Sequence, residues 1–204
     1  MAIAYGWTGK ILWVDLSKNK VTQVATSEYE PEIYLGGVGL NSKIFWDLGT
    51  PKVDAFSPAN PLIISVGPLT GLNGSFNRGE VCGIAPQSYP NEYFTYSGFG
   101  GKFPSALKYA GWDGIVILGA SSKPVYLLIE DDKVSIHDAK DVWGLDTFET
   151  QQRLRSTYPQ ASVFTIGPTG ENLSRIAIIL NETKSASGQG GFGGVMGSKK
   201  LKAI

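Results

Sequence analysis

Cysteine and histidine are nearly missing from the sequence, since one of each occurs among 204 residues. A single cysteine excludes a disulfide within the chain, and the two counts together exclude a metal site built from several Cys or His side chains. A nucleophilic dyad of Cys82 and His137 stays open on these counts. Cys82 lies in the apolar stretch EVCGIA and His137 in the alternating stretch KVSIHDA. These patterns favour the alternative, a buried thiol and a histidine on the surface of a strand.

An excess of charge of one sign and long apolar runs are also missing. The 18 basic side chains balance 18 acidic ones, which argues against a nucleic-acid binder because such proteins usually carry a basic excess. No run approaches the roughly 18 apolar residues that a membrane helix needs. The first residues, MAIAYGWTGK, lack the apolar core and cleavage site of a signal peptide. With 42% hydrophobic residues, we expect a folded cytoplasmic protein that binds neither nucleic acid nor membrane.

Glycine, in contrast, is abundant, with 26 residues. That is roughly 13% of the chain, against about 7% in average proteins. Glycines cluster in three segments, GLNGSFNRG (71–79), SGFGGKF (97–103) and SASGQGGFGG (185–194). Glycine costs conformational entropy on folding, so a cluster indicates either left-handed turns or a close approach of the backbone to a ligand.

The order of motifs indicates an internal duplication. GWTGKILWVDL from Gly6 and GWDGIVILGA from Gly111 are each followed by a hairpin-like stretch and later by a GP turn, PLIISVGPLTG or SVFTIGPTG. An arginine and an apolar strand follow each GP turn. Strands outnumber helices and occur in hairpin pairs, which predicts an α+β fold with two similar mixed or antiparallel sheets related by a pseudo-two-fold axis. We expect one domain over residues 1–204, with repeats at about 5–105 and 106–204.

Three segments have helical features. Residues 30–48 place apolar side chains at helical intervals, although their glycines weaken the first turns. Asp146 with Glu149 three residues later predicts a capping box at the start of a helix. Pro104 suits the first turn of a third helix, which Gly111 would end.

The glycine-rich segment near the end of the sequence fits neither familiar nucleotide motif. Gly188, Gly190 and Gly193 match G-x-G-x-x-G, but no acidic residue follows at the distance that a dinucleotide site needs. The order Gly197-Ser198-Lys199 also departs from the G-K-[ST] of a P-loop. Consecutive backbone N–H groups in such loops can still bind anionic oxygens. The three segments are therefore either ordinary turns or the cradle of a large anionic ligand, to which Arg78 would add a cation.

The chain resembles a known family over residues 5–204. The matching motifs, in the same order and with similar spacing, are GWTGKILWVDLS, YLGGVGL, NPLIISVGPLTG, LKYAGWDGIVILGASSKPVYL, DVWGLDTFET, IGPTGENLSRIAIILN and GGFGGVMGSKKLKAI. They are similar to the N-terminal domain of tungsten-containing aldehyde:ferredoxin oxidoreductases. The resemblance implies a duplicated pair of sheets that forms the base for a bis-pterin tungsten cofactor (molybdenum being the alternative metal), with Mg²⁺ bridging the pterin phosphates.

The resemblance also implies roles for individual residues. Arg78 matches the family arginine that contacts a pterin and lies beside an iron–sulfur cluster. The stretch YSGFGGKF matches the family's Asn-Ser-Gly-Gly pterin loop, which implies cofactor contacts from Gly98 and Gly100. The loop's asparagine has no clear counterpart in this stretch, since either Tyr96 or Gly98 can be aligned with it.

The stretch KSASGQGG matches the family's second pterin loop, Arg-Ala-x-Gly-Arg-Gly-Gly. Ala186 would therefore offer its carbonyl to Mg²⁺, and Gly188 would approach a pterin. Ser185 and Gln189 stand where the family commonly has arginine, and both can donate hydrogen bonds. Ser185 is accordingly expected at the cofactor.

The family's [4Fe–4S] cysteines, its catalytic acid and base groups and its substrate pocket lie in later domains. The partners implied are those domains or a complementary subunit, and ferredoxin through the complete enzyme, which oxidises aldehydes to carboxylic acids. No catalytic residue is expected within this chain. Two alternatives stay open, namely a cofactor-free module that acts in assembly and a domain of a related reductase with another substrate such as an aromatic thioester. Homodimerisation through the face that meets the later domains is a further expectation.

Overall fold

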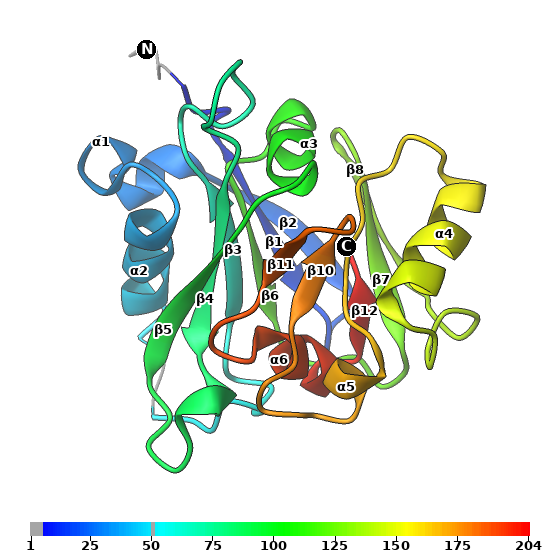
Figure 1. The fold of residues 1–204 in the computed structure, drawn as a ribbon. Coiled ribbons are helices and arrows are strands. Elements are labelled where there is room, and N and C mark those ends of the chain that lie inside the picture. Colours follow the sequence, from blue (N-terminus) through cyan, green and yellow to red (C-terminus); the bar gives the residue numbers. More distant parts are fainter. Residues whose placement is uncertain (1–5, 50–51) are drawn as a thin grey trace.

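Two six-stranded sheets pack against each other in the computed structural model, which describes residues 6–49 and 52–204 (Figure 1). The first sheet consists of β1 (Lys10–Asp15), β2 (Lys20–Ala25), β3 (Leu62–Val66), β4 (Gly79–Ile84), β5 (Phe94–Phe99) and β6 (Gly114–Leu118). The second consists of β7 (Val125–Glu130), β8 (Lys133–Asp138), β9 (Phe164–Thr165), β10 (Ile179–Asn181), β11 (Ser185–Ser187) and β12 (Leu201–Ala203). Both sheets mix parallel and antiparallel pairs, which confirms the predicted α+β class.

One topology occurs twice, as the predicted duplication requires. The strand order is β2-β1-β6-β3-β4-β5 in the first sheet and, read in the same direction, β8-β7-β12-β9-β10-β11 in the second. In each sheet the strand that comes last in the sequence is inserted beside the first strand of a hairpin. The inserted strand is parallel to that neighbour and antiparallel to the strand on its other side.

The boundary between the sheets differs from the predicted boundary between the repeats at about residue 105. Because β6 belongs to the first sheet, the chain passes from one sheet to the other between Leu118 and Val125. The two GW-x-G motifs do not begin equivalent strands, since β1 and β6 are parallel neighbours with Ile11 opposite Gly114. Because β1 and β6 are adjacent and largely buried, both have an apolar sequence, and this shared composition makes them look like repeats. The predicted start at residue 5 lies outside the described residues.

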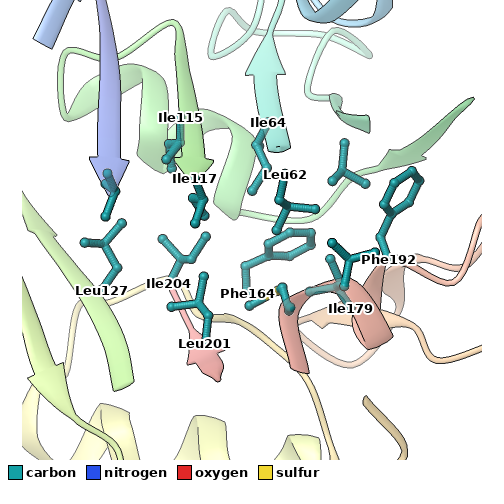
Figure 2. Close-up of a cluster of buried hydrophobic side chains, with 14 of the residues drawn as sticks. Leu62, Ile64, Ile115, Ile117, Leu127, Phe164, Ile179, Phe192, Leu201 and Ile204 are labelled. Atoms are coloured by element: carbon teal, nitrogen blue, oxygen red, sulfur yellow. The ribbon is translucent and has the colours of Figure 1, made fainter. Parts of the chain in front are cut away.

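Helices cover the outer faces of both sheets and fill the space at their ends (Figure 1). The helical elements are α1 (Pro31–Tyr34), α2 (Val38–Asp47), α3 (Phe103–Tyr109), α4 (Thr147–Thr157), α5 (Pro168–Glu171), α6 (Phe192–Ser198) and the 3₁₀ turns Thr26–Tyr29 and Pro86–Ser88. The main core lies between the sheets, where Ile64 and Ile117 face Phe164 and Leu201 (Figure 2). Ile63 alternates to the outer face and packs under α2, so β3 is buried throughout.

The local signals for helices correspond to the structure in two of three places. Asp146 accepts hydrogen bonds from the backbone of Phe148 and Glu149 and forms the predicted capping box of α4. Pro104 lies in the first turn of α3, and Gly111 follows that helix with a φ of +86°. Residues 30–48, in contrast, form two helices, because the chain turns between α1 and α2 with a φ of +60° at Leu35.

The glycine-rich segment near the end of the sequence is partly a helix. Gly193, Gly194 and Gly197 lie in the buried α6. A Cβ on Gly194 would lie 2.7 Å from the carbonyl oxygen of Ser174, and one on Gly197 would overlap the backbone of Gly170 in α5. These glycines therefore allow α6 to pack closely on its neighbours, and this half of the segment has a structural role.

A buried ion pair holds the inserted strand in each sheet. Asp113, directly before β6, is fully buried and accepts from the backbone of Thr8 and Gly9, from the Thr26 hydroxyl and from Lys108 Nζ at 2.7 Å. In the second sheet, Lys202 of β12 donates to the carboxylate of Glu171 and to the carbonyl of Leu145. Glu171 also accepts from the backbone of Gly144.

No helix in the described part of the chain has both the length and the apolar composition needed to cross a membrane.

We expect Asp113→Ala to lower the free energy of unfolding by about 3–5 kcal/mol, because it strands the buried Lys108 ammonium and three further donors. Urea denaturation followed by circular dichroism measures the loss. Lys123→Ala is the matched control, since its ion pair with Asp138 is exposed and contributes little. Equal stabilities of the two variants would contradict the anchoring role of Asp113.

We expect Lys199 to make the protein more stable as the pH rises from about 8 to 10. Lys199 is fully buried, donates to the carbonyls of Pro58 and Gly119, and has a pKa lowered to about 8 because burial penalises the ammonium. The unfolded lysine keeps its ordinary pKa near 10.5, so between these values the unfolded chain binds more protons and the gain is at most about 1.4 kcal/mol per pH unit.

Lys199→Met should lack this contribution, so the difference in unfolding free energy between the two proteins should change steadily over that pH interval. Comparing the two proteins cancels other groups that titrate there, such as Cys82. A difference that is constant from pH 7 to 10 would show that Lys199 keeps an ordinary pKa in the folded state.

Candidate functional site

The free edges of the two sheets meet along one line, which we call the seam. It is formed by β5 and the residues that follow it to Gly101, and by β11 and the residues that follow it to Gln189. The backbone N–H of Gln189 donates to the Ser97 hydroxyl at 3.1 Å across the seam. A Cβ on Gly101 would lie 3.1 Å from Cβ of Ser185, so the two segments are in close contact.

Two amide side chains, of which Asn181 is fully buried, fix the two sides of the seam. Asn181 of β10 accepts from the backbone of Phe103 and donates to the carbonyl of Val163, so it joins α3 to the second sheet. Asn77 donates to the carbonyl of Gly101 at 2.6 Å. The glycine-rich stretch 97–103 is thus held by side chains from both repeats.

All six residues predicted at the cofactor lie along the seam or directly beside it. Gly98 belongs to β5 and Gly100 follows it, whereas Ser185 and Ala186 belong to β11, which Gly188 follows. Arg78 comes immediately before β4, the neighbour of β5. The structure therefore brings the predicted residues from both repeats together.

Two of these glycines have open space where a side chain would be. No atom lies within 4 Å of the Cβ position of Gly188, and the residue is exposed. The Cβ position of Gly100 meets only the Ser185 hydroxyl, at 3.5 Å, and the carbonyl oxygen of Asn77, at 3.7 Å. Gly190, in contrast, has a φ of +81° and packs on Phe192, so turn geometry explains it. Gly188 and Gly100 leave room for the approach of a ligand.

Arg78 and Glu80 converge on the same side of Gly98. The Cβ position of Gly98 lies 2.5 Å from Nη2 of Arg78 and 3.0 Å from Oε1 of Glu80. Arg78 is exposed, whereas burial raises the pKa of the Glu80 carboxyl, an effect that the nearby guanidinium opposes. Arg78 and Glu80 also line a groove of about 520 Å³ with Gly37, Thr70 and apolar residues of the GP turn.

Three buried polar atoms at or beside the seam have no hydrogen-bond partner among the described residues. They are Oδ1 of Asn77, Oε2 of Glu80 and the Ser187 hydroxyl. Sequence reasoning did not select these residues, because Asn, Glu and Ser carry no distinctive spacing here. The signal that could have identified them is their position in the sequence, since Asn77 and Glu80 lie within two residues of Arg78 and Ser187 directly precedes Gly188. Unpartnered buried polar groups are rare in proteins and often accompany binding sites.

The structure contradicts the possible Cys82–His137 dyad and agrees with the alternative. Cys82 is buried in the first sheet, accepts from the Asn41 amide, and has a pKa raised to about 12 by burial. His137 lies on β8 of the second sheet and stacks on Tyr126. Within residues 6–49 and 52–204, no three His, Cys, Asp or Glu side chains are grouped as metal ligands.

Comparison with known proteins shows the same relationship along nearly the whole chain. The family described as aldehyde ferredoxin oxidoreductase, N-terminal domain, matches residues 11–204. The tungsten-containing aldehyde ferredoxin oxidoreductase of Thermococcus kodakarensis is 40% identical over 202 residues, which are 98% of this chain and 33% of that protein. The aliphatic sulfonate oxidoreductase, WOR-like subunit, of Pyrococcus furiosus is 36% identical over 217 residues, which are 98% of this chain and 34% of that protein.

A solved structure has the same fold. In the active site complex BamBC of benzoyl coenzyme A reductase with 1,5-dienoyl-CoA, one chain superposes with a TM-score of 0.92 at 41% identity, over 98% of this chain and 30% of that one. The present chain thus spans about a third of the length of these relatives. The chain belongs to the aldehyde ferredoxin oxidoreductase family and has the fold of that family's N-terminal domain.

Proposed function

We propose that this chain is the pterin-binding domain of a tungsten or molybdenum oxidoreductase, and that the seam is its cofactor site. Backbone groups of Gly98, Gly100, Ala186 and Gly188 would form the cradle, and Arg78 would compensate the charge of the pterin phosphates. The observation that carries this proposal is the open space at Gly188 and Gly100, on facing sides of the seam, beside an exposed arginine. Close relatives are named as tungsten-containing enzymes.

The residues present fit such a group. A large anionic ligand needs backbone donors, room and positive charge, and the seam offers all three. Ser185 and Gln189 add neutral donors where the family commonly has arginine. The unpartnered Ser187 hydroxyl is a further candidate donor. For Mg²⁺ we propose the carbonyl of Ala186, because KSASGQGG matches the family's second pterin loop and carbonyl oxygens are suitable ligands for this ion.

The chemistry is divided between this chain and the rest of the enzyme. When bound, the metal–pterin group would supply the two-electron oxidation of an aldehyde to a carboxylic acid, with a [4Fe–4S] cluster of the complete enzyme and ferredoxin as the proposed electron acceptors. This chain binds and orients the group, and Arg78 is its charged contact. The cluster ligands and the acid and base groups would belong to further domains or to a partner subunit in the cytoplasm, because one buried cysteine cannot hold a cluster.

A second candidate activity is the reduction of an aromatic thioester. The benzoyl coenzyme A reductase complex is as similar to this chain as the curated aldehyde oxidoreductases are. Assays of the complete enzyme with aldehydes and with aryl-CoA thioesters distinguish the two activities. If the enzyme turns over the thioester but no aldehyde, the proposed activity changes to thioester reduction, whereas the proposed cofactor site is unaffected.

We expect the complete protein, purified under anaerobic conditions, to contain tungsten or molybdenum together with pterin. Elemental analysis and the fluorescence of the oxidised pterin measure both. A protein that folds, contains neither metal and yields no pterin would support the remaining alternative, a cofactor-free module that acts in assembly.

We expect Gly188→Val to prevent cofactor loading without harming the fold, because nothing lies within 4 Å of its Cβ position and its φ is not positive. The metal content of the purified enzyme should fall at least tenfold while the unfolding midpoint stays unchanged. Gly197→Val is the matched control, since its side chain overlaps α5 and should destabilise the domain itself. Full metal content in Gly188→Val would exclude Gly188 from the site.

We expect Arg78→Ala to lower the pterin and metal content several-fold, because it removes the cation beside Gly98. Arg78 is exposed and lies outside the core, so circular dichroism should show an unchanged fold. Arg78→Lys should restore part of the content, since it keeps the charge without the planar fork. Unchanged cofactor content in both variants would remove Arg78 from the proposed site.

A further inference from the structure

The loop 188–191, which follows β11 on one side of the seam, is held in place by residues of β5 and of the β4–β5 connection. The N–H of Gln189 donates to the Ser97 hydroxyl at 3.1 Å, and the N–H of Gly190 donates to Oε1 of Gln87 at 2.6 Å. The backbone N–H of Gln87 in turn donates to the carbonyl of Gly190 at 3.3 Å. Gln87 therefore binds Gly190 through both its side chain and its backbone.

These bonds leave Gly188 as the open position of the loop. No hydrogen bond joins its N–H to a residue in the part of the chain that the structure describes, and no atom lies within 4 Å of its Cβ position. The N–H groups of the next two residues, in contrast, are already engaged. A ligand that approaches this loop would therefore meet a free backbone donor at Gly188, in a fixed place.

The restraint matters because the composition of the loop makes it flexible. Its sequence is GQGG, and glycine has more backbone conformations to lose than any other residue. The bonds to Gln87 hold Gly190 in the left-handed region, at a φ of +81°. Without them the loop would sample many shapes, and a ligand would have to order it at an entropic cost on binding.

The 3₁₀ turn Pro86–Ser88, which carries Gln87, is itself anchored by the second sheet's part of the chain. Arg175, the arginine that follows the second GP turn, donates to the carbonyl of Pro86 at 2.8 Å. The same guanidinium pairs with the carboxylate of Glu92, four residues after the turn. The position of Gln87 is therefore fixed from both sides, and a change of its side chain alone would release the loop.

We propose that Gln87 is a positioning residue of the cofactor site, which acts through Gly190 and fixes the loop in the shape that presents Gly188 to the ligand. The inference rests on the proposed function, because it takes the seam as the site of an anionic metal–pterin group. Since Ser185 and Gln189 are neutral, this side of the seam contributes chiefly hydrogen-bond donors, whose strength depends on their direction. Gln87 lies outside the three glycine-rich segments, so no sequence pattern selects it.

Gln87→Met tests the proposal, because it removes the acceptor oxygen and keeps the length of the side chain. In the complete enzyme produced without tungsten or molybdenum, hydrogen-exchange mass spectrometry on peptides that span residues 185–191 should show the Gly190 amide exchanging about tenfold faster than in wild type. In enzyme produced with the metals, the metal and pterin content should fall several-fold. The unfolding midpoint should stay unchanged, because Gln87 is exposed and lies outside the core.

Two further variants separate positioning from a general effect on the protein. Gln87→Glu keeps an acceptor oxygen at the same distance from the backbone, so it should restore both the slow exchange and the cofactor content. Gln23→Met is the matched control, because Gln23 is also exposed but lies on β2, at the edge of the first sheet opposite to the seam. This control should change neither the exchange nor the cofactor content.

Unchanged exchange at Gly190 in Gln87→Met would overturn the proposal, and so would faster exchange with a full cofactor content. A lower content that comes with a lower unfolding midpoint, or that Gln87→Glu does not restore, would also overturn it, because Gln87 would then have a structural role only. The proposed function is tested separately by the wild-type enzyme. Wild-type enzyme without metal and pterin would contradict the proposed function, and with it the role of Gln87, whatever the exchange shows.

Discussion

Each half of the molecule depends on the insertion of one late strand into a sheet that earlier segments have begun. Strand β6 separates the β1–β2 hairpin from β3, and β12 separates the β7–β8 hairpin from β9. Both insertions are secured by a buried ion pair, Asp113 with Lys108 in the first sheet and Lys202 with Glu171 in the second. Such pairs cost desolvation energy, and removing one partner leaves a buried charge. They fix the register of an apolar strand that could otherwise pair in several positions.

This topology determines where a ligand can bind. Because each sheet has a hairpin at one edge, the other edge is formed by β5 or by β11, and the pseudo-symmetric arrangement brings these two edges together. Edge strands carry backbone N–H and C=O groups that no neighbouring strand uses. A site made chiefly of backbone therefore arises at the seam with few special side chains. That explains how a chain with one cysteine and one histidine can still contain a candidate cofactor site.

The sequence predicted the duplication, the capping box at Asp146 and the convergence of the glycine-rich segments. These features have local or repeated patterns that do not depend on distant contacts. The sequence did not predict which segments of the two repeats are equivalent. The motifs that begin at Gly6 and Gly111 look alike because they lead into β1 and β6, which are neighbouring strands of one sheet. The sequence also missed α6, since intrinsic propensity disfavours glycine in helices, whereas here close packing against α5 requires it. The unpartnered atoms of Asn77 and Ser187 depend on three-dimensional surroundings that no spacing reveals.

The relatives constrain which part of the chemistry this domain can carry. Proteins named for aldehyde, sulfonate and benzoyl coenzyme A chemistry share this fold or sequence at 36–41% identity. A domain common to such different substrates is expected to hold what the reactions share, and on the proposed function that is the metal–pterin group. On that proposal, the open glycines would serve this purpose by their shape, whatever substrate is bound elsewhere. On the proposed function, with neutral Ser185 and Gln189 where the family commonly has arginine, Arg78 would supply positive charge beside the group. The proposed cradle would then keep its form while its electrostatics, and with them the properties of a bound metal, differ from those of family members that have arginine at these positions.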